Sequence, residues 1–134
     1  MDRPRAVLAE DFDRVRQAFA DLLAPDLDIV ASVADGEAAL KAVQEFQPDL
    51  VLLDISMPVL DGMSAARKLK QIMPQVKIIF LTMHAEPAYI READFIGAEG
   101  FVLKHRASAE LREAIHAVMA GHRYFPPAKM ALRA

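Results

Sequence analysis

Short runs of apolar residues alternate with longer stretches in which apolar residues recur at helical spacing, and this cycle repeats five times. The continuous runs cover residues 6–9, 29–33, 50–53, 78–81 and 101–103. Runs of this length predict strands, and the periodicity that follows each run predicts an amphipathic helix. The apolar faces of the five helices are Phe12, Val15, Phe19 and Leu22; Ala39, Val43 and Phe46; Ala65, Leu69 and Ile72; Ile90, Ala93 and Ile96; and Leu111, Ile115 and Val118.

Residues that favour helix termini flank the predicted helices. We expect N-caps at Asp11, Asp35 and Ser108, because their side chains can accept hydrogen bonds from free backbone amides. Pro87 suits a first helical turn, and Asp61-Gly62 is most simply interpreted as a turn. Helix ends are predicted just before Pro48, Pro74, Gly97 and Gly121.

Strands that alternate with helices indicate βαβ units, and therefore a parallel sheet with helices on both faces. The runs at 6–9, 50–53 and 78–81 are the most continuously apolar, as expected of strands covered on both faces. Ser32 interrupts the second run and the fifth run is short, so we expect both at sheet edges. The sequence thus predicts an α/β fold, a doubly wound five-stranded parallel sheet of order 2-1-3-4-5 with five helices, which is flavodoxin-like.

The length of 134 residues fits one domain, which we place at residues 1–121. Residues 122–134 differ in character, because Pro126-Pro127 excludes a simple continuation of the last helix. Two interpretations of this segment stay open: a frayed C-terminal tail, or a linker toward a further domain that the 134 residues do not include. Tyr124 and Phe125 could pack on the last helix or form a dimer contact.

Composition excludes several classes of protein. Apolar residues make up 54% of the chain and charged residues 26%, as in a well-packed globular domain. The absence of cysteine excludes disulfides and thiolate metal sites, and it suits a cytoplasmic protein. No apolar stretch has the length of a membrane helix, and acidic residues around the first apolar run argue against a secretory signal. We therefore expect no membrane association.

The net charge of −3 is distributed unevenly. Residues 101–134 carry six Lys or Arg and two acidic residues, whereas residues 1–100 carry ten and seventeen. A concentrated basic stretch of the kind that binds nucleic acid is not visible, so we expect no direct contact of this chain with DNA.

Polar residues stand where the predicted strands end. Glu10 and Asp11 follow the first strand, Asp54 the third and Lys104 the fifth, while Thr82 ends the fourth. Taken singly, each has an ordinary explanation as a cap, a strand residue or a solvated charge. In a doubly wound sheet, however, ligands bind beyond the carboxyl ends of the strands. We therefore expect these five side chains to meet at one edge of the sheet.

This set of side chains fits the chemistry of phosphoryl transfer. Three crowded carboxylates repel one another unless a cation joins them, and oxygen ligands without His or Cys favour Mg²⁺. A lysine and a hydroxyl could hold a phosphoryl group beside the metal, and an aspartate can act as the nucleophile. The buried run 50–53 would then serve to hold Asp54 rigidly at the metal site.

These motifs resemble those of a response-regulator receiver domain of two-component signalling. The resemblance covers residues 4–121 and rests on Glu10-Asp11, on DISMPVLDG at 54–62, on Thr82 in IIFLTMH, and on GAEGFVLK ending in Lys104. The LTMH segment and the AVMAGHRYFPP ending resemble the branch in which a LuxR/NarL-type helix-turn-helix follows the receiver. The resemblance implies a phosphorylation-dependent switch, not an enzyme, that controls transcription through a DNA-binding output domain outside these residues.

The resemblance also implies roles for the site residues. Asp54 would accept the phosphoryl group from a sensor histidine kinase or a phosphotransfer protein. Asp11 and Asp54 would bind Mg²⁺, with Glu10 acting mainly through water and the backbone carbonyl of Ser56 completing the ligands. Lys104 would pair with the phosphoryl oxygens.

Conformational switching is implied at two further positions. The Thr82 hydroxyl would move toward the phosphate, and Phe101 would turn inward behind it, after which the family often forms homodimers. His84 would line the mouth of the site and act with Ser56 on phosphate lifetime. Many receivers have proline after the lysine, whereas Lys104 precedes His105, so this loop is either strained or trans.

Other functions fit the sequence less well. A phosphatase of the haloacid-dehalogenase type needs a general acid two residues after the nucleophile, and that position is Ser56. The acidic first strand–helix turn does not suit a flavin phosphate, no P-loop motif exists, and the four histidines do not form a zinc ligand pair. A receiver that acts by protein contact without phosphorylation remains the alternative from another class.

Overall fold

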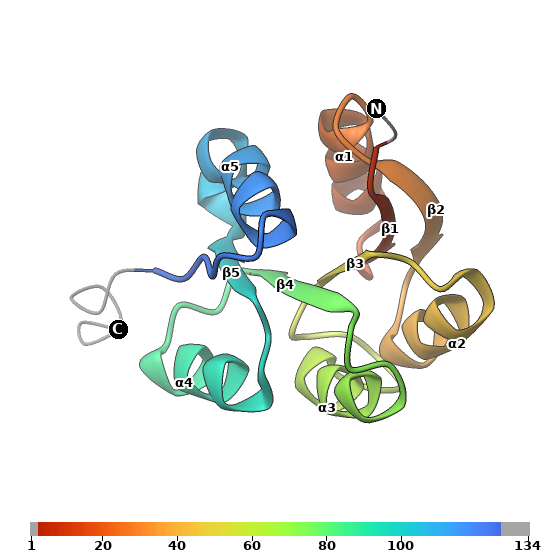
Figure 1. Cartoon of the computed structure of the whole chain (residues 1–134), viewed down its shortest axis with the longest axis vertical. Coiled ribbons are helices and arrows are strands. Elements are labelled where there is room, and N and C mark those ends of the chain that lie inside the picture. Colours follow the sequence, from red (N-terminus) through yellow and green to blue (C-terminus); the bar gives the residue numbers. More distant parts are fainter. Residues whose placement is uncertain (1–2, 127–134) are drawn as a thin grey trace.

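Strands and helices alternate along the chain in a computed structural model, which describes residues 3–126 (Figure 1). The strands are β1 (Arg5–Ala9), β2 (Asp28–Val33), β3 (Leu50–Leu53), β4 (Lys77–Thr82) and β5 (Gly100–Leu103). The helices are α1 (Asp13–Leu23), α2 (Gly36–Phe46), α3 (Gly62–Ile72), α4 (Pro87–Ile96) and α5 (Ala107–Met119), and a short 3₁₀ turn, η1 (Lys104–Arg106), precedes α5. The predicted five strands and five helices are thus confirmed within the described residues.

All five strands are parallel and lie in the order β2-β1-β3-β4-β5, as predicted. Leu53 lies beside Ala9 on one side and Phe80 on the other, so β1, β3 and β4 reach the same edge of the sheet. The pairing continues past β1 and β3, because the Asp54 amide donates to the Ala9 carbonyl over 3.2 Å. The backbone that carries Asp54 is therefore fixed by the sheet itself.

The sheet separates two hydrophobic cores. Alternate residues of the central strands point to opposite faces, so that Val51 and Leu53 join one core while Leu50 and Leu52 join the other. Helices α2, α3 and α4 cover the first face, and α1 and α5 cover the second (Figure 1). Because both faces are covered, β3 and β4 read as nearly continuous apolar runs in the sequence.

Six of the predicted helix boundaries are confirmed. Helices α2, α3 and α5 end at Phe46, Ile72 and Met119, each followed by one capping residue and then by the predicted Pro48, Pro74 or Gly121. Asp35 caps α2, since its carboxylate accepts a hydrogen bond from the Ala38 amide over 2.8 Å. Pro87 is the first residue of α4, and Gly97 ends that helix in the left-handed conformation, with φ of 96°.

Three of the predicted boundaries are wrong. The residue that caps α1 is Phe12 instead of Asp11, and α5 begins at Ala107 because η1 continues directly into it, so Ser108 lies inside the helix. Asp61-Gly62 is a helix start instead of an isolated turn, because the Asp61 carboxylate accepts from the Ser64 amide over 2.9 Å and caps α3.

The two edges of the sheet differ. Strand β2 is partly exposed, whereas β5 is buried and its outer edge pairs with the chain that follows α5. The Phe101 amide donates to the Tyr124 carbonyl over 2.8 Å, and the Tyr124 amide donates to the Glu99 carbonyl over 3.0 Å. The part of the expected tail beyond residue 126 lies outside the described residues. Among the helices of residues 3–126, none has the length and apolar character needed to cross a membrane.

Candidate functional site

Four of the predicted site residues meet at the carboxyl edge of the sheet. Oxygen atoms of Glu10, Asp11 and Asp54 lie within 4.8 Å of one another. The Lys104 ammonium donates to Asp54 Oδ2 over 2.7 Å and also pairs with Glu10. The Glu10 and Asp54 side chains are buried, and the Lys104 side chain is 12% exposed. Residues that are up to 94 positions apart in the sequence are therefore joined in one ionic cluster.

Asp54 is held by the backbone on both sides. The Ile55 amide donates to Asp54 Oδ1 over 2.7 Å, and the Gly62 amide donates to the Ile55 carbonyl over 2.7 Å. A Cβ atom on Gly62 would lie 1.9 Å from the Asp54 carbonyl oxygen, so only glycine fits at the start of α3. The loop between β3 and α3 therefore packs directly against the backbone of Asp54.

Lys104 remains charged in this environment. Desolvation lowers the pKa of its ammonium group, but the hydrogen bonds to Asp54 and Glu10 outweigh that effect, and the pKa lies above its ordinary value. The ammonium therefore neutralises two buried carboxylates at once.

The Lys104–His105 peptide is trans, since no cis peptide occurs among residues 3–126.

Glu10 and Asp11 have different surroundings. Burial raises the pKa of the Glu10 carboxyl, although Lys104 and the Phe12 amide, which donates to Glu10 Oε2 over 3.0 Å, act in the opposite direction. Asp11 Oδ1 is buried and accepts no hydrogen bond within the described part of the chain. An unpaired buried carboxylate oxygen is unfavourable unless a cation or water meets it. Asp11, which belongs to the acidic cluster, thus has a free ligand position.

The donor set fits Mg²⁺. The cluster offers carboxylate oxygens from Glu10, Asp11 and Asp54, without sulfur or imidazole, and one of these oxygens lacks a partner. Hard oxygen ligands in this number suit Mg²⁺, which usually keeps several water ligands.

Ser56 and Thr82 are engaged in other hydrogen bonds. The Ser56 hydroxyl lies 2.6 Å from His84 Nε2, across the mouth of the site. Thr82 is fully buried, and its hydroxyl accepts from the His84 amide over 3.2 Å. His84 therefore contacts both residues.

Phe101 is buried beside the site, in register with Phe80 on β4. Its ring centroid lies 6.2 Å from that of Phe80 and 6.3 Å from that of Phe125, which stacks on it with an interplanar angle of 28°. Phe125 thus covers one face of the Phe101 ring.

Residues 6–116 match the family described as the response regulator receiver domain. The chain belongs to this family. Its fold, its acidic cluster and its lysine agree with the resemblance seen in the sequence. The match spans most of the chain, and it includes each of the eight residues to which the sequence assigned a role.

Relatives of this receiver come from several bacteria. The receiver is 34% identical over 125 residues to the transcriptional regulatory protein LnrK of Bacillus subtilis, a match that covers 92% of this chain and 57% of LnrK. It is 36% identical over 123 residues to the oxygen regulatory protein NreC of Staphylococcus aureus, which covers 90% of this chain and 57% of NreC. The chain thus spans little more than half the length of the curated relatives it matches.

A solved LuxR-family two-component response regulator from Aurantimonas has the same fold. It superposes with a TM-score of 0.91 at 32% identity, over 98% of this chain and 96% of that one. This likeness confirms the predicted branch of the family.

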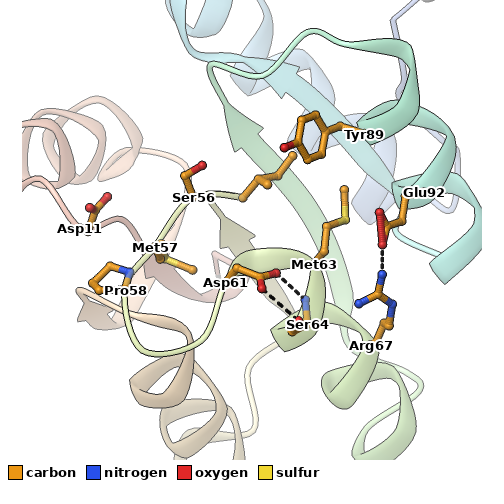
Figure 2. A pocket seen from close by; sticks show the side chains of 11 residues that line it. Asp11, Ser56, Met57, Pro58, Asp61, Met63, Ser64, Arg67, Tyr89 and Glu92 are labelled. Carbon is orange, nitrogen blue, oxygen red and sulfur yellow. Dashed lines mark hydrogen bonds and ion pairs between the residues drawn. The ribbon is translucent and has the colours of Figure 1, made fainter.

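A cavity of about 720 Å³ opens beside the acidic cluster, between the β3–α3 loop, α3 and α4 (Figure 2). Asp11 and Ser56 lie at one end of it, and an ion pair between Arg67 of α3 and Glu92 of α4 lies at the other. Asp11 of the acidic cluster therefore lines this cavity, and the ion pair ties α4 to α3.

Two features of the site were missed in the sequence. Gly62 contacts the Asp54 backbone, and the only local signal was a glycine after an aspartate, which equally fits a turn. Phe125 covers Phe101, but no periodic pattern linked these two residues.

Proposed function

We propose that this receiver is a Mg²⁺-dependent phosphoacceptor that takes a phosphoryl group onto Asp54. The donor is a phosphohistidine of a sensor histidine kinase or of a phosphotransfer protein. The observation that carries the proposal is the buried Asp54 carboxylate, which a backbone amide and the Lys104 ammonium orient beside two further acids. A receiver that acts by protein contact without phosphorylation would not need this arrangement.

The chain's own residues supply most of the chemistry. A carboxylate oxygen of Asp54 forms a bond to phosphorus, and the bond from phosphorus to the donor nitrogen breaks with its electron pair going to that nitrogen. The proton on the second ring nitrogen of the phosphohistidine makes the leaving group a neutral imidazole. Lys104 moves its hydrogen bond from the carboxylate to a phosphoryl oxygen, which keeps the buried charge compensated. Bound Mg²⁺ would neutralise phosphoryl charge, held by Asp11, Asp54 and the Ser56 carbonyl, with Glu10 acting through water.

Phosphorylation then changes the surface near β4 and β5. The phosphoryl group adds roughly 1.5 to 2 negative charges and three strong acceptors at Asp54. The Thr82 hydroxyl exchanges its bond with the His84 amide for one with a phosphoryl oxygen, and Phe101 follows. We propose that the change controls a DNA-binding output domain in a longer protein and that it promotes homodimers. The name of the relative LnrK, a transcriptional regulatory protein, supports this proposal.

The test is the intact mass of the protein after incubation with acetyl phosphate, with and without Mg²⁺. One phosphoryl adduct that requires Mg²⁺ is expected, and it should be absent from Asp54→Asn. Asp28→Asn is the matched control, because Asp28 is an exposed aspartate at the opposite end of the sheet. Folded protein without an adduct would support the contact-only module instead.

A further inference from the structure

The chain after α5 is bound to the outer edge of β5. We call residues 122–126 the strap. Its Tyr124 exchanges two backbone hydrogen bonds with the strand, one from the Phe101 amide over 2.8 Å and one to the Glu99 carbonyl over 3.0 Å. Tyr124 and Gly100 form a parallel β-bridge, so the strap continues the sheet beyond β5. A side chain on Gly100 would reach 3.4 Å from the Tyr124 carbonyl oxygen and 2.9 Å from Ile79. Glycine therefore allows this close approach.

Side chains of the strap bind α4 and the loop after it. Arg123 forms an ion pair with Asp94 near the end of α4 and donates to the Ala98 carbonyl over 3.3 Å. Its guanidinium also lies 4.6 Å from the centre of the Phe125 ring. One arginine thus links the end of α4 to the ring that stacks on Phe101.

On its other side the strap borders the second core, against which the partly buried Tyr124 side chain packs, and a cavity. This cavity of about 290 Å³ is lined by Phe101 and Leu103 of β5, by Arg106 and Glu110, and by strap residues. Arg123 and Asp94 are both more than half exposed, so their ion pair contributes little to stability. The stack of Phe125 on Phe101, the packing of Tyr124 against the second core and the two backbone hydrogen bonds hold the strap on the sheet.

Phe101, which Phe125 of the strap covers, also lies next to the phosphorylation site. Phe80 and Thr82 are alternate residues of β4, so they point to the same face of the sheet, and they pair with Phe101 and Leu103 of β5. Displacement of Thr82 toward Asp54 would open space on that face beside Phe101. Entry of the Phe101 ring into this space would separate it from Phe125.

We propose that residues 122–126 are a strap that docks on β5 while Asp54 is unphosphorylated and is released when Phe101 moves inward. Release of the strap would thus couple phosphorylation of Asp54 to the chain that follows residue 126. This inference rests on the proposed function, because phosphorylation supplies the displacement of Thr82. Coupling between two sites is reciprocal, so a docked strap also opposes phosphorylation.

Amide hydrogen exchange tests the release directly in the 134-residue chain. Beryllofluoride with Mg²⁺ serves as the phosphoryl analogue. We expect slower exchange in the peptides around Asp54 and faster exchange of the Phe101 and Tyr124 amides. The Lys77 amide, which donates to the Asp49 carbonyl over 3.1 Å at the far end of the sheet, is the internal control and should not change.

The outcomes separate the two claims. Protection around Asp54 with unchanged Phe101 and Tyr124 amides would overturn the strap and leave the phosphoacceptor intact. No protection around Asp54 in the presence of the analogue would overturn both.

Strap variants test the reciprocal effect. Phe125→Ala and Arg123→Ala should raise the affinity for beryllofluoride with Mg²⁺ by roughly fivefold, at the lower end of typical allosteric couplings. Phe125→Tyr keeps the stacked ring and should bind as the unmodified chain does. Arg112→Ala is the matched control, because it removes an ion pair with Asp26 on the other side of α5. Equal affinities in all four variants would overturn the proposed opposition of strap and phosphoryl group.

Discussion

Replacing Lys104 by Met would remove the cation that lies between the Glu10 and Asp54 carboxylates, while keeping an apolar side chain of similar length. Both carboxylates are buried, and Lys104 Nζ lies 2.7 Å from Asp54 Oδ2. Lys104→Met therefore leaves the two acids facing each other without a counter-charge. Added Mg²⁺ can take over that charge, so the loss of stability should depend on the metal.

The size of the effect follows from the geometry. Carboxylate oxygens of the cluster lie within 4.8 Å of one another. At that separation, two unit charges repel by about 3.5 kcal/mol with an effective dielectric constant of about 20. Removing one partner of a buried ion pair costs about 3–5 kcal/mol. We expect Lys104→Met to lower the free energy of unfolding by about 3 kcal/mol without Mg²⁺ and by about 1 kcal/mol with saturating Mg²⁺.

Urea unfolding followed by far-ultraviolet circular dichroism measures both values, because the chain has no tryptophan. Lys70→Met is the matched control: Lys70 is also largely buried and pairs with Glu99 over 2.8 Å, far from the acidic cluster. The Lys70→Met variant should lose the same free energy of unfolding with and without Mg²⁺. If Lys104→Met showed the same lack of dependence on Mg²⁺, the cluster would not be a cation site and our reasoning would be refuted.

Three further predictions concern the same structure. Gly62→Ala should lower the free energy of unfolding by about 3 kcal/mol or more, measured by thermal unfolding, because its Cβ would collide with the Asp54 carbonyl; a fully stable variant would contradict that packing. Asp35→Ala should cost about 1 kcal/mol in urea through loss of the α2 cap, whereas Glu37→Ala should cost less than about 0.5 kcal/mol; equal losses would argue against the cap. Burial raises the pKa of Glu10 above 4.5, so the carboxylate takes up a proton at a higher pH than usual. Without Mg²⁺, its contribution to stability is greatest at low pH and is lost as pH rises through the raised pKa. The affinity for Mg²⁺, measured by calorimetry, should depend on pH in the opposite direction, because it weakens as pH falls through that pKa and Glu10 is protonated. Glu10→Gln should make the affinity for Mg²⁺ less dependent on pH.

Much of the fold and site could be predicted because both depend on local pattern and on parallel topology. The apolar runs identified the strands, and parallel strands bring their carboxyl ends to one edge. Asp54 and Lys104 follow β3 and β5 directly, so their meeting needed no knowledge of side-chain packing. Asp35 and Gly97 were found because their conformations are set by a few neighbouring residues.

The remaining features depend on approaches between distant segments. Asp11 and Asp61 carry the same local signal for a cap, yet of the two only Asp61 caps a helix. Helix α1 has Phe12 at its N-cap, and the Asp11 carboxylate lies beside Glu10 and Asp54 instead. The contact of Gly62 with Asp54 and the stack of Phe125 on Phe101 arise only after the sheet has formed. No spacing in the sequence encodes these distances.

Locating the modified residue tests the central claim most directly. Acyl phosphates are reduced by borohydride, which would convert a phosphorylated aspartate into homoserine. After incubation with acetyl phosphate and Mg²⁺, borohydride treatment and digestion, peptide mass spectrometry should find homoserine at position 54. Homoserine at Asp11 or Asp61, or its absence from a folded protein that carries the phosphoryl adduct, would contradict the assignment of Asp54 as the phosphoacceptor.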